Sequence, residues 1–415
     1  MRTLITSFFA LSIFYSCTTG TPTFCGDGIQ NGNETGIDCG GDCPPCASYS
    51  IEGHAQKGPF LNGSSVFLSA LDSNLNQVGI GYNSQIIDNS GYFFFSALNL
   101  PTPYVVLRAD GFYFNEVCGN PSAAQITLNA VSNLGAVPAV NVNTLTHLEK
   151  ARVEYLVSNG KSFAQAKEQA LKEVLSIFNI DTTMAMPNAE LLSIANSSVY
   201  DGVLIAITSI LQGYRSESEF SDLMANLVTD LRTDGQLNSA SLASELISHA
   251  KLLDTVAIRQ NIIDRYLDLG ISVSVPNFGQ HITNYLLNTN HTGGEDVIDY
   301  PETGLSGANI LNEIDTVFTE FQFYSLAAKR PNDCVDLTVK ISRYFSSCVN
   351  CWYYSLGSGQ NWAVSSYDAT TFSQTYTSLG LNADISVGFY AGNFKLEFFL
   401  NGSSTPYRTK FITVN

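Results

Sequence analysis

The chain has 415 residues and 45% hydrophobic residues, which is ample for packed cores, and its length favours roughly two or three domains over one. Its formal net charge is −17, from 20 basic and 37 acidic residues. This surplus of acid argues against nucleic-acid binding and against electrostatic adsorption to anionic lipid, because both need clustered Lys and Arg.

The first 16 residues have the layout of a secretory signal. Arg2 precedes an apolar run of 12 residues, Leu4 to Tyr15, and the small residue Ser16 precedes Cys17. The run is too short to span a bilayer, and no later run reaches the roughly 18–20 apolar residues required. This layout resembles a bacterial lipoprotein signal, which implies that Cys17 is acylated and anchors the chain in the cell envelope, at the outer membrane or cell surface. Ordinary secretion with cleavage nearby is the alternative.

Residues 17–47 form a cysteine-rich module that is almost free of apolar side chains, so cross-links must hold it together. A bond between its last two cysteines would close a small loop stiffened by two prolines. We therefore favour bonds from each of the first two cysteines to one of the last two, with zinc as the competing account of their spacing. The four cysteines are Cys25, Cys39, Cys43 and Cys46.

The spacing C-x-D-G-x-x-N-G-x-E-x-x-x-D-C-G-G-x-C-x-x-C in this module resembles a motif that follows the lipidated cysteine in surface lipoproteins of Bacteroidota. Its side-chain oxygens could hold Ca²⁺, the only cofactor that the sequence suggests. The alternative is that they cap turns. The residues concerned are Asp27, Asn31, Glu34 and Asp38.

Residues 48–135 alternate short apolar runs with turn signals, which predicts a β-sandwich. The expected strands are Ser65–Leu71, Val78–Ile87, Gly91–Ala97, Tyr104–Ala109, Phe112–Val117 and Gln125–Asn129. The region resembles a carboxypeptidase-regulatory-like, transthyretin-like domain through Ile51-x-Gly53, Asp88-x-x-Gly91-x-Phe93 and Ala109-Asp110-Gly111-Phe112. The resemblance implies a spacer or binding accessory without catalytic residues, with Phe93 and Phe112 in the core.

Residues 136–289 change to a helical period and predict an α-helical domain of six or so helices. Ser162 with Gln165 and Ser216 with Glu219 have the spacing of capping boxes, and Val203–Leu211 is apolar all round, as in a central helix. The opening, Val142 to Leu148, resembles the start of a helical region in bacterial envelope proteins.

Residues 290–312 are typical of a linker, and residues 313–415 predict a second β-sandwich. We expect Cys348 and Cys351 to form disulfides. With Cys334 they make three cysteines in this domain, so one of the three is either free or bonded to Cys118. Aromatic residues that could stack on a glycan are Trp362, Trp352 and Tyr354, with core packing as the alternative.

The sequence has none of the catalytic spacings HExxH, G-x-S-x-G or Walker A. His147 and His249 fall in predicted helices, where packing or capping is the expected role. We therefore expect a multidomain α+β protein with two β-sandwiches flanking a helical domain. Its predicted function is non-enzymatic binding or adhesion. The expected partner is a glycan or an envelope or matrix protein, and the N-terminal lipid is expected to insert into the membrane. The alternatives are a structural spacer of an envelope complex and a secreted glycan hydrolase with carboxylates in the helical domain.

Overall fold

The computed structural model describes residues 25–36, 38–43, 45–137, 139–183 and 185–291, the strands after residue 304 given below, and residues 403–406. Within this part of the chain, β-sheets come first, seven helices follow, and two disulfides lie near the N-terminus. The predicted α+β class is confirmed.

Two sheets form the first half of the fold. One has the strand order β4-β1-β9 and the other β3-β2-β5-β8; all pairs are antiparallel except β1 with β9. A short hairpin, β6-β7, follows β5. The strands are β1 (Ala47–Gln56), β2 (Ser65–Leu71), β3 (Gln77–Gln85), β4 (Tyr92–Leu100), β5 (Tyr104–Gly111), β6 (Phe114–Asn115), β7 (Asn120–Pro121), β8 (Ile126–Asn133) and β9 (Val142–Asn143).

Alternate residues of the two sheets share one buried core, as the period-two pattern predicts. Phe93 of β4 is 1% exposed, in agreement with the prediction that it packs inside. The prediction for Phe112 is wrong, because its side chain is 41% exposed. The chain leaves the sheet at this point, where the carbonyl of Phe112 accepts a hydrogen bond from the Leu61 amide. The expected strand Phe112–Val117 is accordingly reduced to β6.

Two glycines of the sequence motifs are required by close backbone approach. A Cβ on Gly53 would lie 1.9 Å from the carbonyl oxygen of Val140. Val140 is held this close because its backbone amide donates to the carbonyl of Glu52. Gly91 has a φ of +80°, and a Cβ there would lie 2.3 Å from the carbonyl oxygen of Ala55. Only glycine satisfies both positions without displacing the backbone.

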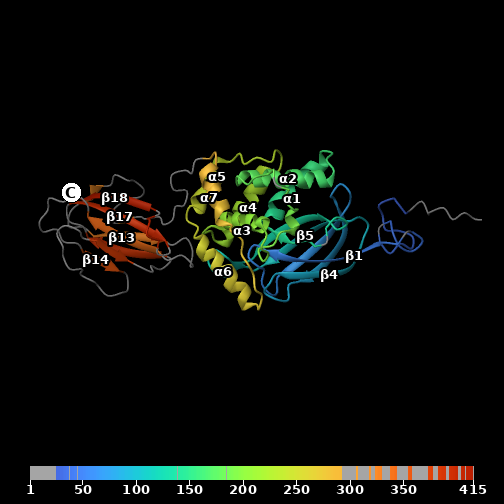
Figure 1. The fold of residues 1–415 in the computed structure, drawn as a ribbon, viewed down its shortest axis with the longest axis horizontal. Helices are drawn as coiled ribbons and strands as arrows, with labels where there is room; N and C mark the ends of the chain where they lie inside the picture. The colour runs from blue at the N-terminus through green and yellow to red at the C-terminus, as the bar shows by residue number, and fades with distance from the viewer. Residues whose placement is uncertain are drawn as a thin grey trace, which may run out of the picture.

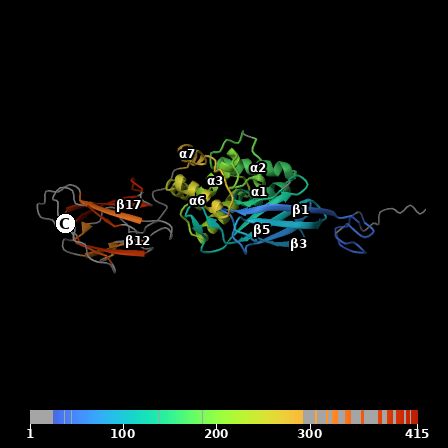
Figure 2. The ribbon, with the colours of Figure 1, turned by 60° about the horizontal axis from the view of Figure 1, so that its bottom comes forward.

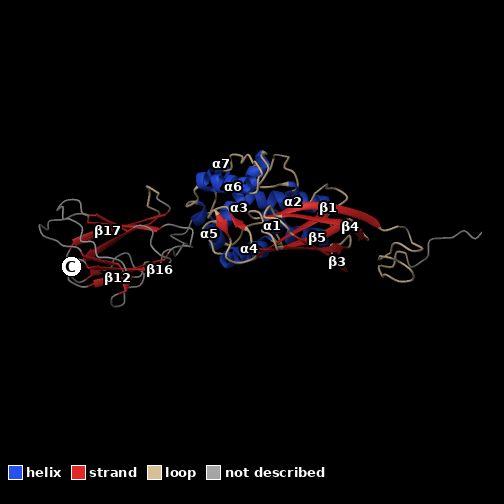
Figure 3. Ribbon diagram, turned by 90° about the horizontal axis from the view of Figure 1, so that it is seen from below, coloured by secondary structure: helices blue, strands red, loops and turns tan. Residues whose placement is uncertain are grey.

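The helices lie above the strands of the first two sheets (Figure 2) and form a group beside them (Figure 3). Residues 201–212 of α3 are all buried, so the predicted central helix is confirmed. The capping boxes at Ser162 and Ser216 also form as predicted. The helices are α1 (Thr144–Ser158), α2 (Phe163–Ile177), the 3₁₀ turn η1 (Ala189–Leu191), α3 (Val199–Gln212), α4 (Glu217–Leu231), α5 (Ala240–Ala250), α6 (Thr255–Asp268) and α7 (Gly279–Asn288).

Asn143 connects the sheets to the helices. Its backbone extends β9 alongside β1, while its side chain accepts from the Thr146 amide and caps α1. The side-chain nitrogen Nδ2 of Asn143 donates to the Ala189 carbonyl of η1 at 2.8 Å. One fully buried side chain therefore fixes where β9 ends, where α1 begins and where η1 packs.

Helices α1 and α2 cover the side of β8 and β5 that points away from the first core. Val131 of β8 packs there with Val153 of α1 and with Ala166 and Ala170 of α2, in a second apolar cluster. Residues on both sides of the second half of β8 are thus buried, which places α1 firmly on the sheet.

A buried cluster of charges lies where α1, α2 and η1 meet. The ammonium group of Lys167 donates to Glu149 and, at 2.6 Å, to Glu190, and these three side chains are at most 3% exposed. Ser132 of β8 donates to the second oxygen of Glu190 at 3.1 Å. Oxygen Oε2 of Glu149 is buried and has no hydrogen-bond partner within the described residues. Two carboxylates thus share one ammonium group.

A second buried ion pair joins Lys57, the residue after β1, to Glu116 in the β6–β7 hairpin. Lys57 donates to both oxygens of Glu116, at 2.9 and 2.8 Å, and lies over the rings of Tyr113 and Phe220. Burial lowers the pKa of Lys57 to about 8, although the Glu116 carboxylate opposes this shift. These contacts hold the end of β1 against the β6–β7 hairpin and against Phe220 of α4.

The C-terminal strands form two further sheets, of order β10-β12-β16-β14 and β11-β18-β17-β13-β15. Figure 1 shows them at the end of the molecule opposite the N-terminal module. Most of their side chains, and most of the predicted linker, lie outside the described residues. The strands are β10 (Leu305–Ser306), β11 (Val317–Phe318), β12 (Phe323–Lys329), β13 (Leu337–Arg343), β14 (Tyr354–Gly357), β15 (Ser373–Tyr376), β16 (Asn382–Gly388), β17 (Gly392–Leu400) and β18 (Arg408–Val414).

Burial raises the pKa of Glu149 to about 7, and the neighbouring Glu190 carboxylate adds to the rise against the attraction of Lys167. The unfolded chain releases this proton near the ordinary value of 4.5, before the folded protein does. The contribution of Glu149 is therefore fully present below pH 4.5 and is lost as the pH rises through about 7.

We predict that Glu149→Gln removes this dependence. Relative to the wild type, the free energy of unfolding of the variant should rise by roughly 2–3 kcal/mol between pH 5 and pH 8, because a shift of one pKa unit corresponds to about 1.4 kcal/mol. Urea unfolding at a series of pH values measures it. Glu154→Gln changes a half-buried carboxylate of the same helix that is paired with Lys150, away from the buried cluster, and should leave the wild-type slope unchanged. A difference between Glu149→Gln and wild type that is constant with pH would contradict the prediction.

Candidate functional site

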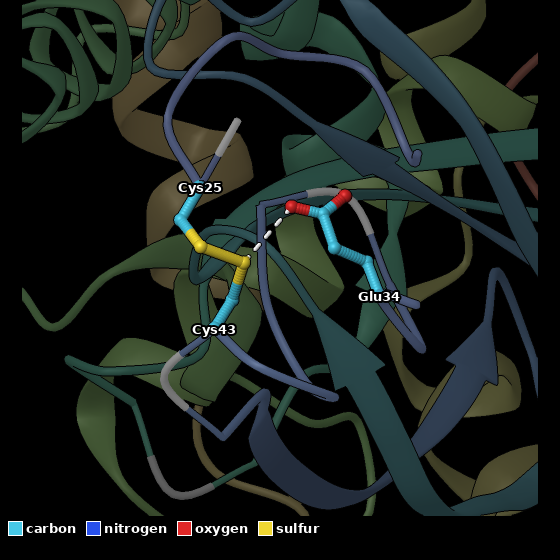
Figure 4. Close-up of side chains that lie close together, drawn as sticks. All are labelled: Cys25, Glu34 and Cys43. Carbon is cyan, nitrogen blue, oxygen red and sulfur yellow. Dashed lines mark hydrogen bonds between the residues drawn. A yellow bond between two sulfur atoms is a disulfide. The ribbon is translucent and has the colours of Figure 1, made fainter. Parts of the chain in front are cut away.

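The N-terminal module contains the disulfides Cys25–Cys43 and Cys39–Cys46. This is one of the two pairings that keep Cys43 and Cys46 apart. Figure 4 shows the first disulfide beside the Glu34 carboxylate, whose Oε1 lies 3.1 Å from Cys43 Sγ. A disulfide sulfur has no proton to donate and no thiolate to offer a metal. The close group of Cys25, Glu34 and Cys43 is therefore a cross-link with an adjacent carboxylate, and its two sulfurs cannot act as zinc ligands.

The predicted calcium ligands already have hydrogen-bond partners within the module. Asp38 accepts from the Gly28 amide through both oxygens, at 3.1 and 3.0 Å. Asp27 accepts from the Ile29 amide and from the side chain of Asn31, at 2.9 Å each.

Glu34 completes this set by accepting from the Asn31 amide at 3.0 Å. Three of the four predicted ligands, Asp27, Glu34 and Asp38, thus accept backbone amides, as the turn-capping alternative expects, whereas the side chain of Asn31 donates to Asp27. Calcium binding by them stays a prediction.

Most of the other predicted site residues fall outside the described part of the chain. These are Cys17, Cys348, Cys351, Trp352 and Trp362. Tyr354 begins β14, but its side chain is not described. Cys118, in the turn between β6 and β7, is disulfide-bonded.

The two helical histidines are hydrogen-bond acceptors, His249 buried and His147 half-buried. His147 Nδ1 accepts from the Asn129 amide of β8 at 3.2 Å, and His249 Nδ1 accepts from the Tyr214 amide at 3.1 Å. Burial lowers the pKa of His147 to about 4, with Lys150 adding to the shift, and burial lowers the pKa of His249 well below its ordinary value. Both rings are therefore neutral near pH 7 and link separate elements, as packing or capping residues do.

An open hollow of about 660 Å³ lies between the loop that precedes α3 and the segment that joins α6 to α7. Its volume is in the range of small-ligand sites. The lining combines aliphatic side chains with hydroxyl, amide and carboxylate groups: Pro187, Leu191, Leu192, Ala195, Asn196, Ser197, Ser198, Asp201, Ser272, Val273 and Ser274.

Sequence reasoning missed this hollow because its two walls are about 75 residues apart in the chain and each looks like an ordinary loop. The available signal was the stretch Ile271 to Val275, which alternates aliphatic residues and serine as a strand does, yet lies between two helices. The buried charges of Lys167, Glu149 and Glu190 were missed for a similar reason, since each looks like a solvated residue in its own segment.

Comparison of the chain with protein-family models, with curated proteins and with solved structures found no match in any of the three. Among the residues that the structure describes, no helix has the length and apolar character that crossing a membrane requires.

We predict that replacing Cys39 and Cys46 together by serine loosens the module without unfolding the rest. The bond closes a loop over a separation of 7 residues. In the chain-entropy account, its loss costs the module roughly 2–3 kcal/mol. Limited proteolysis within residues 26–42 should become faster, while the thermal unfolding of the sheets and helices stays unchanged. Replacing Ser48 by alanine at the start of β1 is the control. Equal protection of the variant and wild-type modules would contradict the prediction.

Proposed function

We propose that the protein is an extracytoplasmic lipoprotein, held at the outer membrane or cell surface by acyl chains on Cys17. The observation that carries this proposal is the pair of disulfides shortly after Cys17, Cys25–Cys43 and Cys39–Cys46. Such cross-links persist in oxidising compartments and are rare in the cytosol of most organisms. They support the lipoprotein-like signal, because a chain that passes through that signal reaches an oxidising compartment.

We further propose a non-enzymatic role in binding or adhesion, with a glycan or an envelope or matrix protein as partner. The proposal rests on the modular layout: a cross-linked module, two sheets that we infer to be a transthyretin-like sandwich, the helices, and two C-terminal sheets that we infer to be a second sandwich. Trp352, Tyr354 and Trp362 remain the candidate contacts in the last module.

The hydrolase alternative requires a pair of accessible carboxylates in the helical domain. Three carboxylates there are buried, Glu149, Glu190 and Asp201. The first two contact Lys167, and Asp201 accepts from Ser193 and Ser198. These three carboxylates are therefore engaged in structural contacts and are poor candidates for the catalytic pair. The spacer alternative has no separate observation in its favour.

We predict that the intact mass of the purified wild-type protein exceeds that of residues 17–415 by the mass of its acyl chains. Cys17→Ser should move the protein from the membrane fraction to the soluble extract, since the anchoring thiol is lost. Thr18→Ser, one residue further on, should leave membrane association unchanged. A wild-type mass equal to the bare polypeptide would contradict the anchoring proposal.

We predict that deleting residues 313–415 abolishes binding to a glycan and matrix-protein array, because the stacking aromatics lie in that module. Within the full chain, Trp362→Ala should weaken the interaction by about tenfold or more, whereas Trp362→Phe should retain most of it by keeping a ring. Circular dichroism checks that the variants are folded. Unchanged binding after the deletion would remove the C-terminal module from the binding role.

A further inference from the structure

We propose that the hollow beside α3 binds an extended, uncharged peptide segment of a partner protein, which adds as a strand to the backbone of residues 272–274. This second site is independent of the C-terminal module and adds a protein partner to the binding role proposed above. Its walls are residues 195–198, before α3, and residues 272–274, between α6 and α7.

The backbone of residues 272–274 is free to pair. These residues have no backbone hydrogen bond to any other part of the chain that the structure describes. Their side chains alternate as in a strand, with Ser272 and Ser274 exposed, Val273 half-buried and Val275 buried. Residues 272–274 belong to no sheet of the described chain, but their unpaired donors and acceptors lie beside a cavity, where an extended peptide can pair with them as it does with a sheet edge.

The residues that follow this wall, Val275 and Pro276, are fixed to helices α6 and α3. Arg259 of α6 donates to the carbonyl of Val275 and, at 2.8 Å, to that of Pro276. Pro276 packs against Gly202 of α3, where an added Cβ would lie 3.3 Å from the proline ring. A fixed edge loses little conformational entropy when a peptide binds, so even a short contact can be productive.

The lining selects against charged ligands. No Lys, Arg or His is among its residues, so an anion has no counter-charge there. The one carboxylate, Asp201, is 3% exposed and accepts from the Ser193 amide and from Ser198, so it is not available for a cation.

The lining likewise has no aromatic ring on which a sugar could stack. Aliphatic groups such as Leu191 and Ala195 suit small apolar side chains of a peptide, while the exposed serines suit polar ones. The chemistry thus favours a neutral, alternating peptide over a glycan.

The test uses the full chain carrying Cys17→Ser and a capped peptide that alternates threonine and valine as the probe. At saturating peptide, hydrogen exchange of those amides of residues 272–274 that face the peptide should slow by at least about tenfold, because they gain hydrogen bonds. The same peptide with all of its backbone amides N-methylated should give no protection, because neither of its edges can then pair. Protection by both peptides would overturn backbone pairing.

Two substitutions locate the site. Ser274→Pro removes one free N–H and should abolish peptide binding, measured by fluorescence anisotropy, whereas Ser274→Ala should retain it. Ser197→Trp, on the opposite wall, should block the hollow, and Ser218→Trp on the exposed face of α4 should have no effect. Peptide binding that survives both Ser274→Pro and Ser197→Trp would overturn the proposal. Protection of residues 272–274 by a maltoheptaose probe instead of the peptide would also overturn it, in favour of a glycan.

Discussion

The contact on which the arrangement of helices depends is the buried sharing of one ammonium group by two carboxylates. Lys167 of α2 contacts Glu149 of α1 and Glu190 of η1, and Glu190 reaches β8 through Ser132. A buried charge without its partners is costly, so each element must be in place before the others are stable. The cluster therefore favours one relative placement of these elements over nearby alternatives that apolar packing alone would tolerate.

Asn143 also fixes the position of α1 relative to the sheet, through hydrogen bonds and without a charged group. Its backbone pairs with β1 and its side chain caps α1, so the sheet and the first helix share a residue. The side chains of α1 and α2 then close over Val131, and the core of the sheets continues without a break into the helices. The hollow adjoins this region, because Leu191 of η1 and Asp201 of α3 are part of its lining, so one of its walls is attached to elements that the buried contacts hold in place.

Local patterns predicted much of the fold. The strand Ser65–Leu71 has the expected bounds, and the capping residues Ser162 and Ser216 start their helices, because these signals depend on neighbours in sequence. The exposure of Phe112, the pairing of β9 with β1 and the burial of Lys167 depend on contacts over long separations. The same distinction applies to the sites: the cysteine spacing indicated cross-links, whereas the hollow required two distant loops to meet.

The direct attachment of the cross-linked module to β1 has a mechanical consequence. Cys46 is bonded to Cys39, and the next residue, Ala47, already pairs with Leu100 of β4. A pull applied upstream of residue 47 therefore acts along the axis of β1, across hydrogen bonds that run perpendicular to the strand. Those bonds are loaded in shear and share the tension, instead of opening one at a time like a zip. Drag or traction on the body would be resisted by the first sheet as a whole.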